Sequence, residues 1–203
     1  MHASTREHII EKADTLFYEG GFEATSFADI AVVVGISRGN FYHHFKTKNE
    51  ILDAVIARRM ETTRAMLAQW EDEAAHPRDR ILSFAGMLIV NRAKIMAFGC
   101  PVGSLSTELA KLDHAAQGRA AEIFGLFRDW LAGQFRALGH ARQAEDLALH
   151  LLSRSQGIAV MAATFRDERF IRKEVEGIGA WLHALPSHHG THKMRDAECL
   201  SYS

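Results

Sequence analysis

Cysteine and long apolar runs are scarce in this sequence, and each scarcity removes a class of protein. Only Cys100 and Cys199 are present, and neither belongs to a CxxC pair, which argues against a disulfide scaffold and a zinc finger. No apolar run approaches the roughly 20 residues that a membrane span requires. The N-terminus lacks the apolar segment of a signal peptide. We therefore expect a cytoplasmic protein with no membrane partner.

An excess of charge of either sign is also lacking. The chain has 24 Lys and Arg against 25 Asp and Glu, which gives a formal net charge of −1. Domains that bind nucleic acid usually show a basic balance, so the total charge does not favour that function. The distribution is more informative, because Arg38, Lys46 and Lys48 are close together while most nearby acids fall on other predicted segments.

Neither a strand pattern nor an internal repeat stands out, and the N-terminal region predicts two short helices joined by a glycine turn. Ser26 supplies an N-cap, Gly35 a left-handed helix end and Ser37 the next N-cap. The second helix buries Phe41 and Phe45 at i and i+4. Apolar residues of the first helix recur at i, i+3, i+4 and i+7; they are Phe27, Ile30, Ala31 and Val34. This geometry inserts a helix into the major groove of DNA, and a plain helical hairpin in a core is the alternative.

A family resemblance runs through the same region. It is carried by Leu16–Ser26, Ile30–Ala31, Gly35–Gly39, Phe41–Phe45 and Lys48, and these residues closely resemble the N-terminal domain of TetR-family transcriptional regulators. The match covers about the first quarter of the chain. It implies an all-α fold, with a three-helix helix-turn-helix head followed by a C-terminal helical bundle for ligand binding and dimerisation. Beyond the head the resemblance carries architecture and little information about the ligand.

The chain divides accordingly. We expect residues 1–46 to form the DNA-binding domain, residues 47–186 the ligand-binding and dimerisation domain, and residues 187–203 a disordered tail. Within the second domain, apolar periodicity and the Gly and Pro positions predict helices at residues 48–75, 78–97, 103–112, 115–138, 141–165 and 169–185.

Eight residues are expected to face double-stranded operator DNA. Ser26, Tyr42, Lys46 and Lys48 are predicted phosphate contacts, which position the head. Arg38, Asn40 and His43 are predicted to lie near base edges, and Gly39 to allow a close approach. A single recognition helix makes too few contacts, so we expect a homodimer whose heads, about 34 Å apart, read a palindrome.

The last two predicted helices are rich in small residues, which implies close helix packing. The resemblance implies that these helices form a four-helix interface between two subunits, and internal packing of the bundle is the alternative. The predicted interface residues are Leu151, Ile158, Ala162, Ile171, Val175, Ile178 and Leu182.

The middle of the chain is rich in methionine and aromatic residues, which adapt to flat apolar molecules. The resemblance, rather than this composition, implies a pocket for an unidentified small-molecule effector, which we expect to be largely apolar or aromatic. Any one of these residues has plain core packing as its alternative. The predicted lining residues are Met66, Met87, Asn91, Ile95, Phe98, Cys100, Phe124, Phe127, Gln156 and Met161.

The predicted function is a repressor, with an activator or a cysteine-based electrophile- or redox-responsive regulator as alternatives. Cys100 carries the last of these, because a predicted helix start favours a reactive thiol, although a buried inert thiol is the simpler interpretation. We expect no enzyme, cofactor or metal site. Glu73 and His76 form half of a di-iron ExxH pair without a second half, and Cys100 with His114 lacks a third, orienting group. Potential metal ligands in the tail, His188, His189, His192 and Cys199, lack a rigid frame.

Overall fold

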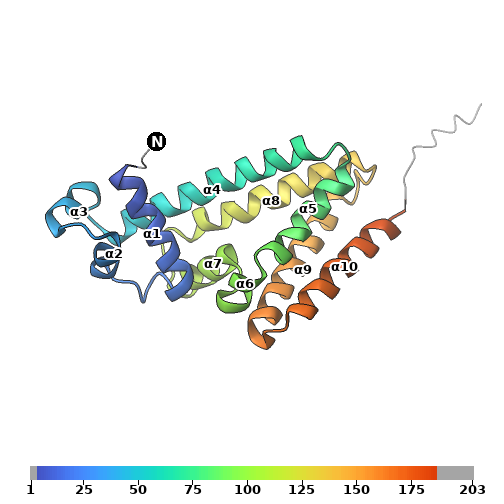
Figure 1. Ribbon diagram of the computed structural model, residues 1–203. Coiled ribbons are helices and arrows are strands. Elements are labelled where there is room, and N and C mark those ends of the chain that lie inside the picture. The colour runs from blue at the N-terminus through green and yellow to red at the C-terminus, as the bar shows by residue number, and fades with distance from the viewer. Residues whose placement is uncertain (1–3, 187–203) are drawn as a thin grey trace, which may run out of the picture.

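The computed structural model describes residues 4–186, with the backbone alone at Arg38, and this part of the chain forms ten α-helices and no strand (Figure 1). The predicted all-α class is therefore confirmed. The helices are α1 (Thr5–Gly20), α2 (Phe27–Val34), α3 (Arg38–His44), α4 (Lys48–Glu73), α5 (Pro77–Val90), α6 (Arg92–Phe98), α7 (Pro101–Lys111), α8 (Gln117–Ala137), α9 (Ala144–Phe165) and α10 (Glu168–Ala184).

Local capping explains where the helices of the head begin and end. The side chain of Ser26 accepts a hydrogen bond from the backbone N–H of Asp29 at 3.1 Å, while the Ser26 N–H donates to the Asp29 carboxylate at 2.8 Å. Hydrogen bonding of the Asp29 carboxylate with the Ser26 side chain, and then with the Ser26 backbone N–H, lowers the pKa of Asp29. Gly35, at φ 73°, closes α2 in the left-handed region, and Ser37 caps α3. The predicted helix-turn-helix is confirmed.

Burial of aromatic rings fixes the angle of α3. Phe41 and Phe45 are almost fully buried, and the Phe27 ring packs edge-on against Phe41 at 4.6 Å and stacks with Tyr42 at 5.1 Å. Truncating such a buried phenylalanine typically costs about 3–5 kcal/mol. The apolar core of the head consists of Ile9, Ile10, Ala13, Phe17, Phe22, Ile30, Ala31, Val34, Phe41 and Phe45.

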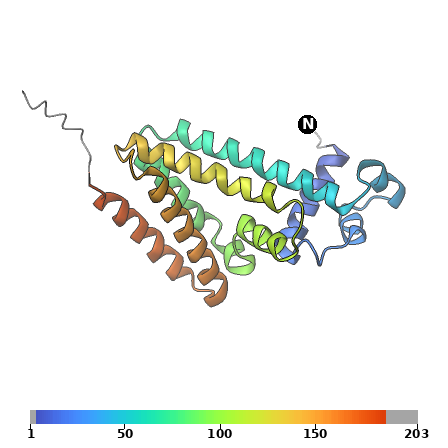
Figure 2. The same ribbon diagram turned by 180° about the vertical axis from the view of Figure 1, so that it is seen from behind.

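The body is a bundle built around two long helices. Figures 1 and 2 show α4 and α8 side by side along its length, with α5, α9 and α10 on the other flank. The short helix α7 lies between α8 and the head, where it contacts α1. Two body helices, α4 and α7, therefore meet the head directly.

The structure corrects the predicted single helix at residues 78–97. It breaks at Asn91, whose side-chain amide and backbone N–H both donate to the carbonyl of Met87 at 3.0 Å. Asparagine bonds locally in this way and competes with helix continuation, so α5 ends at Val90 and α6 follows.

The helix predicted to start at residue 103 starts at Pro101. It is capped by the Cys100 sulfur, which accepts a hydrogen bond from the Gly103 N–H. The tail predicted at residues 187–203 lies outside the described residues.

The predicted dimer residues also need correction. Six of them are buried within one protomer, namely Leu151, Ile158, Ala162, Ile171, Ile178 and Leu182, and only Val175 is half-buried. The apolar face of α10 packs on α5 and α9, and α9 packs on α8. Helical spacing identifies an apolar face but not the helix that covers it, and here the protomer covers its own.

The described residues include no single helix that is long and apolar enough to cross a membrane. One pair, Pro77–Val90 with Arg92–Lys111, reaches that length and composition only together, and it bends by 60°.

Burial of Ile178 predicts a measurable contribution to protomer stability. Ile178→Ala should lower the free energy of unfolding by about 2–5 kcal/mol, because it leaves a cavity between α10 and its neighbours. Urea unfolding measures this value, with Lys173→Ala on the exposed face of α10 as the control. A variant that keeps wild-type stability but no longer self-associates would restore Ile178 to a subunit interface.

Candidate DNA-binding surface and ligand cavity

The end of the head carries most of the residues predicted to meet DNA. Gly39, Asn40, Tyr42 and His43 are exposed on α3, and Lys46 is exposed in the turn that follows. Ser26, at the start of α2, is also exposed. Figure 1 places α3 at the end of the molecule opposite α10. Arg38 is the first residue of α3.

Lys48 does not join this group. Its ammonium donates to the carbonyl of Phe22 at 3.0 Å and to that of Glu23 at 3.3 Å, and lies 4.3 Å from the centre of the Phe22 ring. The side chain is thereby turned to the loop between α1 and α2. The predicted phosphate contact is replaced by a structural role inside the head.

A carboxylate from the body holds the same loop from the other side. Glu108 on α7 accepts from the backbone N–H of Phe22 and from that of Glu23, both at 2.9 Å. Lys48 and Glu108 together bind both N–H and both C=O groups of these two residues, an arrangement we call the Phe22–Glu23 clamp. Gly21 permits it, because its φ is +89° and an added Cβ would lie 3.0 Å from the Glu108 carboxylate.

His114, just after α7, completes the support of this loop. Its Nδ1 accepts from the Ala116 N–H at 3.0 Å, so the ring proton sits on Nε2, 3.3 Å from the side-chain oxygen of Asn49. The His114 ring packs edge-on against Phe22, with centroids 5.2 Å apart. Phe22 is thus fixed through its backbone and its ring. Sequence reasoning missed these contacts, for which the Gly20–Gly21 pair is the only local signal.

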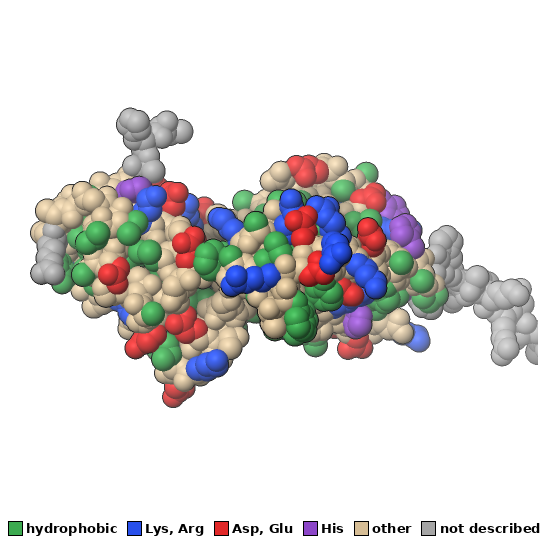
Figure 3. All heavy atoms as spheres, turned by 60° about the horizontal axis from the view of Figure 1, so that its bottom comes forward, with side chains coloured by type: hydrophobic (Ala, Val, Ile, Leu, Met, Phe, Trp, Pro, Cys, Tyr) green, Lys and Arg blue, Asp and Glu red, His purple; other side chains and the backbone are tan. Residues whose placement is uncertain are grey.

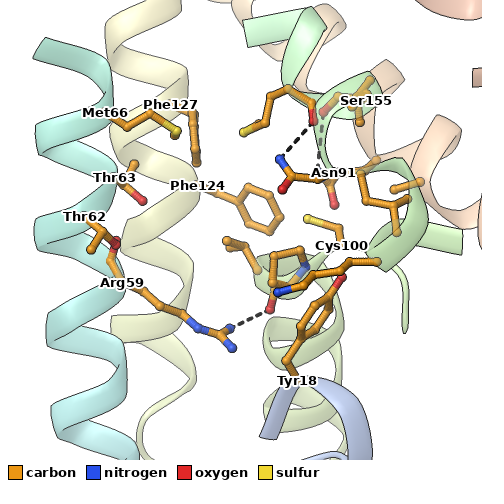
Figure 4. A pocket seen from close by; sticks show the side chains of 18 of the residues that line it. Tyr18, Arg59, Thr62, Thr63, Met66, Asn91, Cys100, Phe124, Phe127 and Ser155 are labelled. Atoms are coloured by element: carbon orange, nitrogen blue, oxygen red, sulfur yellow. Dashed lines mark hydrogen bonds between the residues drawn. The ribbon is translucent and has the colours of Figure 1, made fainter. Parts of the chain in front are cut away.

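A cavity of about 350 Å³ opens between α4, the helices α5 to α9, and α1 (Figure 4). Eight of the ten predicted residues line it: Met66, Met87, Asn91, Ile95, Cys100, Phe124, Phe127 and Gln156. Phe98 and Met161 do not. The Phe98 ring lies outside against Tyr18, at 5.5 Å, and Met161 is exposed on another face of α9.

The head contributes part of the cavity wall, which sequence reasoning also missed. Asp14, Thr15, Tyr18 and Glu19 of α1 line it. The Tyr18 hydroxyl donates to the Gly99 carbonyl at 2.7 Å, and burial, followed by the nearby Cys100, raises the pKa of Tyr18 to about 12. Tyr18 is therefore a neutral donor near neutral pH, and it joins α1 to the start of α7.

A buried arginine makes the second connection at this wall. Arg59 on α4 contacts Asp14 of α1 through Nε and Nη2, at 2.7 and 2.6 Å, and donates through Nη1 to the Pro101 carbonyl at 2.6 Å. It therefore ties together α1, α4 and α7. Breaking a buried pair by removing one partner is strongly destabilising, about 3–5 kcal/mol.

Other candidate chemistry finds little support in the geometry. Among residues 4–186 no group of three His, Cys, Asp or Glu side chains could hold a metal ion. His76 accepts from the Arg78 N–H as the cap of α5, and Glu73 accepts from Gln69. The tail histidines and Cys199 lie outside the described residues.

The side of the body shown in Figure 3 has no basic patch. Lys and Arg side chains there are interleaved with Asp and Glu. The ion pairs agree, since Glu168 lies 2.8 Å from Arg92 and 2.5 Å from Arg172. Such a surface has no single-sign field to attract a nucleic acid, so this side of the body is not favoured as a site for DNA.

Two family models match the chain. The model described as bacterial regulatory proteins of the tetR family matches residues 9–55. The model described as the C-terminal domain of LmrA/YxaF-like transcriptional regulators matches residues 60–175, more than half of the chain.

Known proteins agree with these models. The HTH-type transcriptional repressor DhaR of Mycobacterium sp. strain GP1 is 25% identical over 127 residues, 62% of this chain and 61% of DhaR, so the match spans less than two thirds of that relative. An uncharacterised HTH-type transcriptional regulator in the lacX 3′ region of Lactococcus lactis is 26% identical over 170 residues, covering 81% of this chain and 86% of the relative.

Solved structures share the fold. A TetR transcriptional regulator from Legionella pneumophila has a TM-score of 0.80 at 24% identity, over 89% of this chain and 98% of that one. A TetR transcriptional regulator from Chloroflexus aurantiacus has a TM-score of 0.78 at 21% identity, over 89% and 94%.

The clamp predicts slow hydrogen exchange at two amides. Glu108→Gln removes the charge and turns an NH₂ group toward one of the N–H donors, so the amides of Phe22 and Glu23 should exchange about tenfold faster or more. Hydrogen exchange measured by NMR resolves both amides. The matched control is Glu122→Gln, which removes an exposed carboxylate from α8. Equal protection in wild type and Glu108→Gln would show that the carboxylate does not hold the loop.

Proposed function

Because the chain belongs to the TetR family of bacterial transcriptional regulators, we propose that it is a homodimeric repressor that leaves a palindromic operator when a small, largely apolar molecule fills the cavity. The observation that carries this proposal is the shared cavity wall. Helix α1 of the head lines it together with the start of α7, and the far end of α7 holds the head through the clamp. Occupancy and head position are thereby connected by direct contacts.

DNA recognition is assigned to α3 and its flanks. Arg38, Asn40 and His43 face base edges, and Gly39 admits the helix to the groove. Contacts to phosphates come from Ser26, Tyr42 and Lys46, which are exposed around the same end of the head. Lys48 acts indirectly, by fixing the loop on which α2 depends.

The dimer surface is the outer face of α9 and α10. On α9 an exposed stripe recurs at helical spacing, with Leu149 and Val160 each 57% exposed, and it consists of Leu149, Ser153, Gly157, Val160 and Thr164. On α10 the neighbouring positions are small, namely Gly177, Ala180 and Ala184. Arg154 lies across Gly177 and pairs with Glu174 at 2.9 Å, which joins the two helices into one surface. Exposed apolar and small residues of this kind favour close packing against a second subunit.

Helix α7 supplies the link between the two sites. Cys100, Pro101 and Val102 line the cavity at its start, and Glu108 lies two turns further along. A ligand that moves the start of α7 therefore acts on α1 through Tyr18 and on the Phe22–Glu23 loop through Glu108. A hundredfold release requires the ligand to favour the released state by about 2.7 kcal/mol.

Two alternatives share this architecture. An activator would use the same head and cavity with the opposite effect on transcription. A regulator that responds to electrophiles or oxidants would use Cys100, which lines the cavity and caps α7. Cys100→Ser separates the last case, because only a covalent sensor loses its response while operator binding persists.

Operator binding tests the proposed function. After selection of bound sequences from genomic DNA fragments, Asn40→Ala should weaken the selected site by about 1–3 kcal/mol and relax the preference at one position. Lys46→Ala should weaken all sequences alike and reduce the salt slope by about one. Titrations at several salt concentrations separate the two effects, and Glu122→Ala on the body is the control.

The stoichiometry of the same complex tests the dimer. Sedimentation should give two chains on each palindromic site. Tight binding by a single chain, or wild-type titrations for both Asn40→Ala and Lys46→Ala, would reject this assignment.

A further inference from the structure

One threonine in the cavity has an unused hydroxyl. Thr63, on α4, is 7% exposed and lines the cavity, and its hydroxyl has no hydrogen-bond partner within residues 4–186. The adjacent Thr62 donates to the carbonyls of Arg58 and Arg59 at 3.0 and 3.1 Å. Figure 4 shows Thr63 between Arg59 and Met66, on the side of α4 that faces the aromatic rings of α8. The Thr63 oxygen is not sealed from the cavity space, so its hydroxyl can bond to a molecule that enters there.

The other polar side chains deep in the cavity each make at least one internal hydrogen bond. Ser155 donates to the Leu152 carbonyl at 2.6 Å and accepts from the Gln156 amide at 3.4 Å. The Asn91 amide donates to Met87, at the exposed rim. Thr63 is therefore distinguished from its polar neighbours by the absence of an internal bond among the described residues.

The charges of the wall balance one another. Buried Arg59 is paired with Asp14 and bonded to the Pro101 carbonyl. Glu19 and Lys94, of opposite sign, are exposed at the rim. Deep in the cavity an ionised group would give up its hydration without meeting an unpaired opposite charge, because Glu19 and Lys94 stay at the exposed rim, and this burial is strongly unfavourable. An uncharged ligand has no such cost.

The remaining wall is apolar and contains three phenylalanine rings. Phe84 and Phe127 pack edge-to-face at 5.6 Å, and Phe124 lines the cavity from α8, one turn before Phe127. The methionines Met66 and Met87 add adaptable contacts. The volume of about 350 Å³ lies at the lower end of small-molecule sites, which suits a compact ring system.

We infer that the cavity takes an uncharged, ring-containing molecule with one hydrogen-bonding oxygen, a ketone, ester or alcohol, that bonds to the Thr63 hydroxyl. This inference rests on the proposed function for the role of the cavity. Beyond that function, it specifies that the effector is uncharged, that its polar group is an oxygen, and that Thr63 is the residue that binds this oxygen.

Four probes with one ring system test this class by isothermal titration calorimetry on the full chain without DNA. They are methyl naphthyl ketone, naphthalene, naphthoate and naphthylmethylamine. The ketone should bind at least tenfold more tightly than the carboxylate or the ammonium. Thr63→Val, which keeps the shape and removes the hydroxyl, should weaken ketone binding about three- to tenfold and leave naphthalene within about twofold. Thr62→Val is the matched control and should change neither, because its hydroxyl is already bonded to the backbone.

The inference is rejected if naphthoate or naphthylmethylamine binds as tightly as the ketone, if Thr63→Val leaves the ketone unaffected, or if neither the ketone nor naphthalene binds up to its solubility limit. A separate operator titration distinguishes this failure from failure of the proposed function. Ketone binding through Thr63 without any change in operator affinity would support the ligand class and reject ligand-controlled repression. Operator release by a charged compound would support repression and reject the class.

Discussion

The Phe22–Glu23 clamp is the constraint that determines how the head is held against the body. Glu108 takes both backbone N–H groups at 2.9 Å, and Lys48 takes both carbonyls at 3.0 and 3.3 Å. Hydrogen bonds to charged groups contribute about 1.5–3 kcal/mol each, which is large beside the few contacts that otherwise hold a surface loop. The head is therefore attached to the bundle through α7 as well as through the continuous chain into α4.

A second attachment between head and body lies beside the cavity, where a bound ligand can act on it. Tyr18 bonds to Gly99, and Arg59 joins Asp14 to Pro101, so α1 is tied to the first residues of α7. The cavity lies beside these ties, and its wall belongs to both parts of the molecule. A ligand can shift a conformational equilibrium only through differential contacts with the two states. Contacts with α1 and α7 offer such a difference, because both helices have partners in the head.

Local chemistry made the head predictable. Ser26, Gly35 and Ser37 determine where α2 and α3 begin and end through neighbours a few residues away, and the structure has each of these caps. Eight of the ten residues predicted to line the cavity do so, although they make up only part of its wall. Contacts between residues far apart in the sequence could not be predicted. The sequence around Glu108 does not indicate that its carboxylate binds a loop 85 residues earlier. The apolar stripe of α10 likewise has the same sequence whether α5 or a second subunit covers it. Asn91 showed a further limit, since one side-chain hydrogen bond outweighed the continuing periodicity of residues 78–97.

Operator affinity in a double-mutant cycle tests most directly whether the cavity communicates with the head through α7. Ala159→Trp fills the cavity from α9 as a substitute for a ligand, and Glu108→Ala removes the clamp. The account predicts that Ala159→Trp weakens operator binding tenfold or more, about 1.4 kcal/mol, in the wild-type background and less than about twofold in Glu108→Ala. The same factor in both backgrounds would contradict it and assign the communication to the cavity's contacts with α1 and α4.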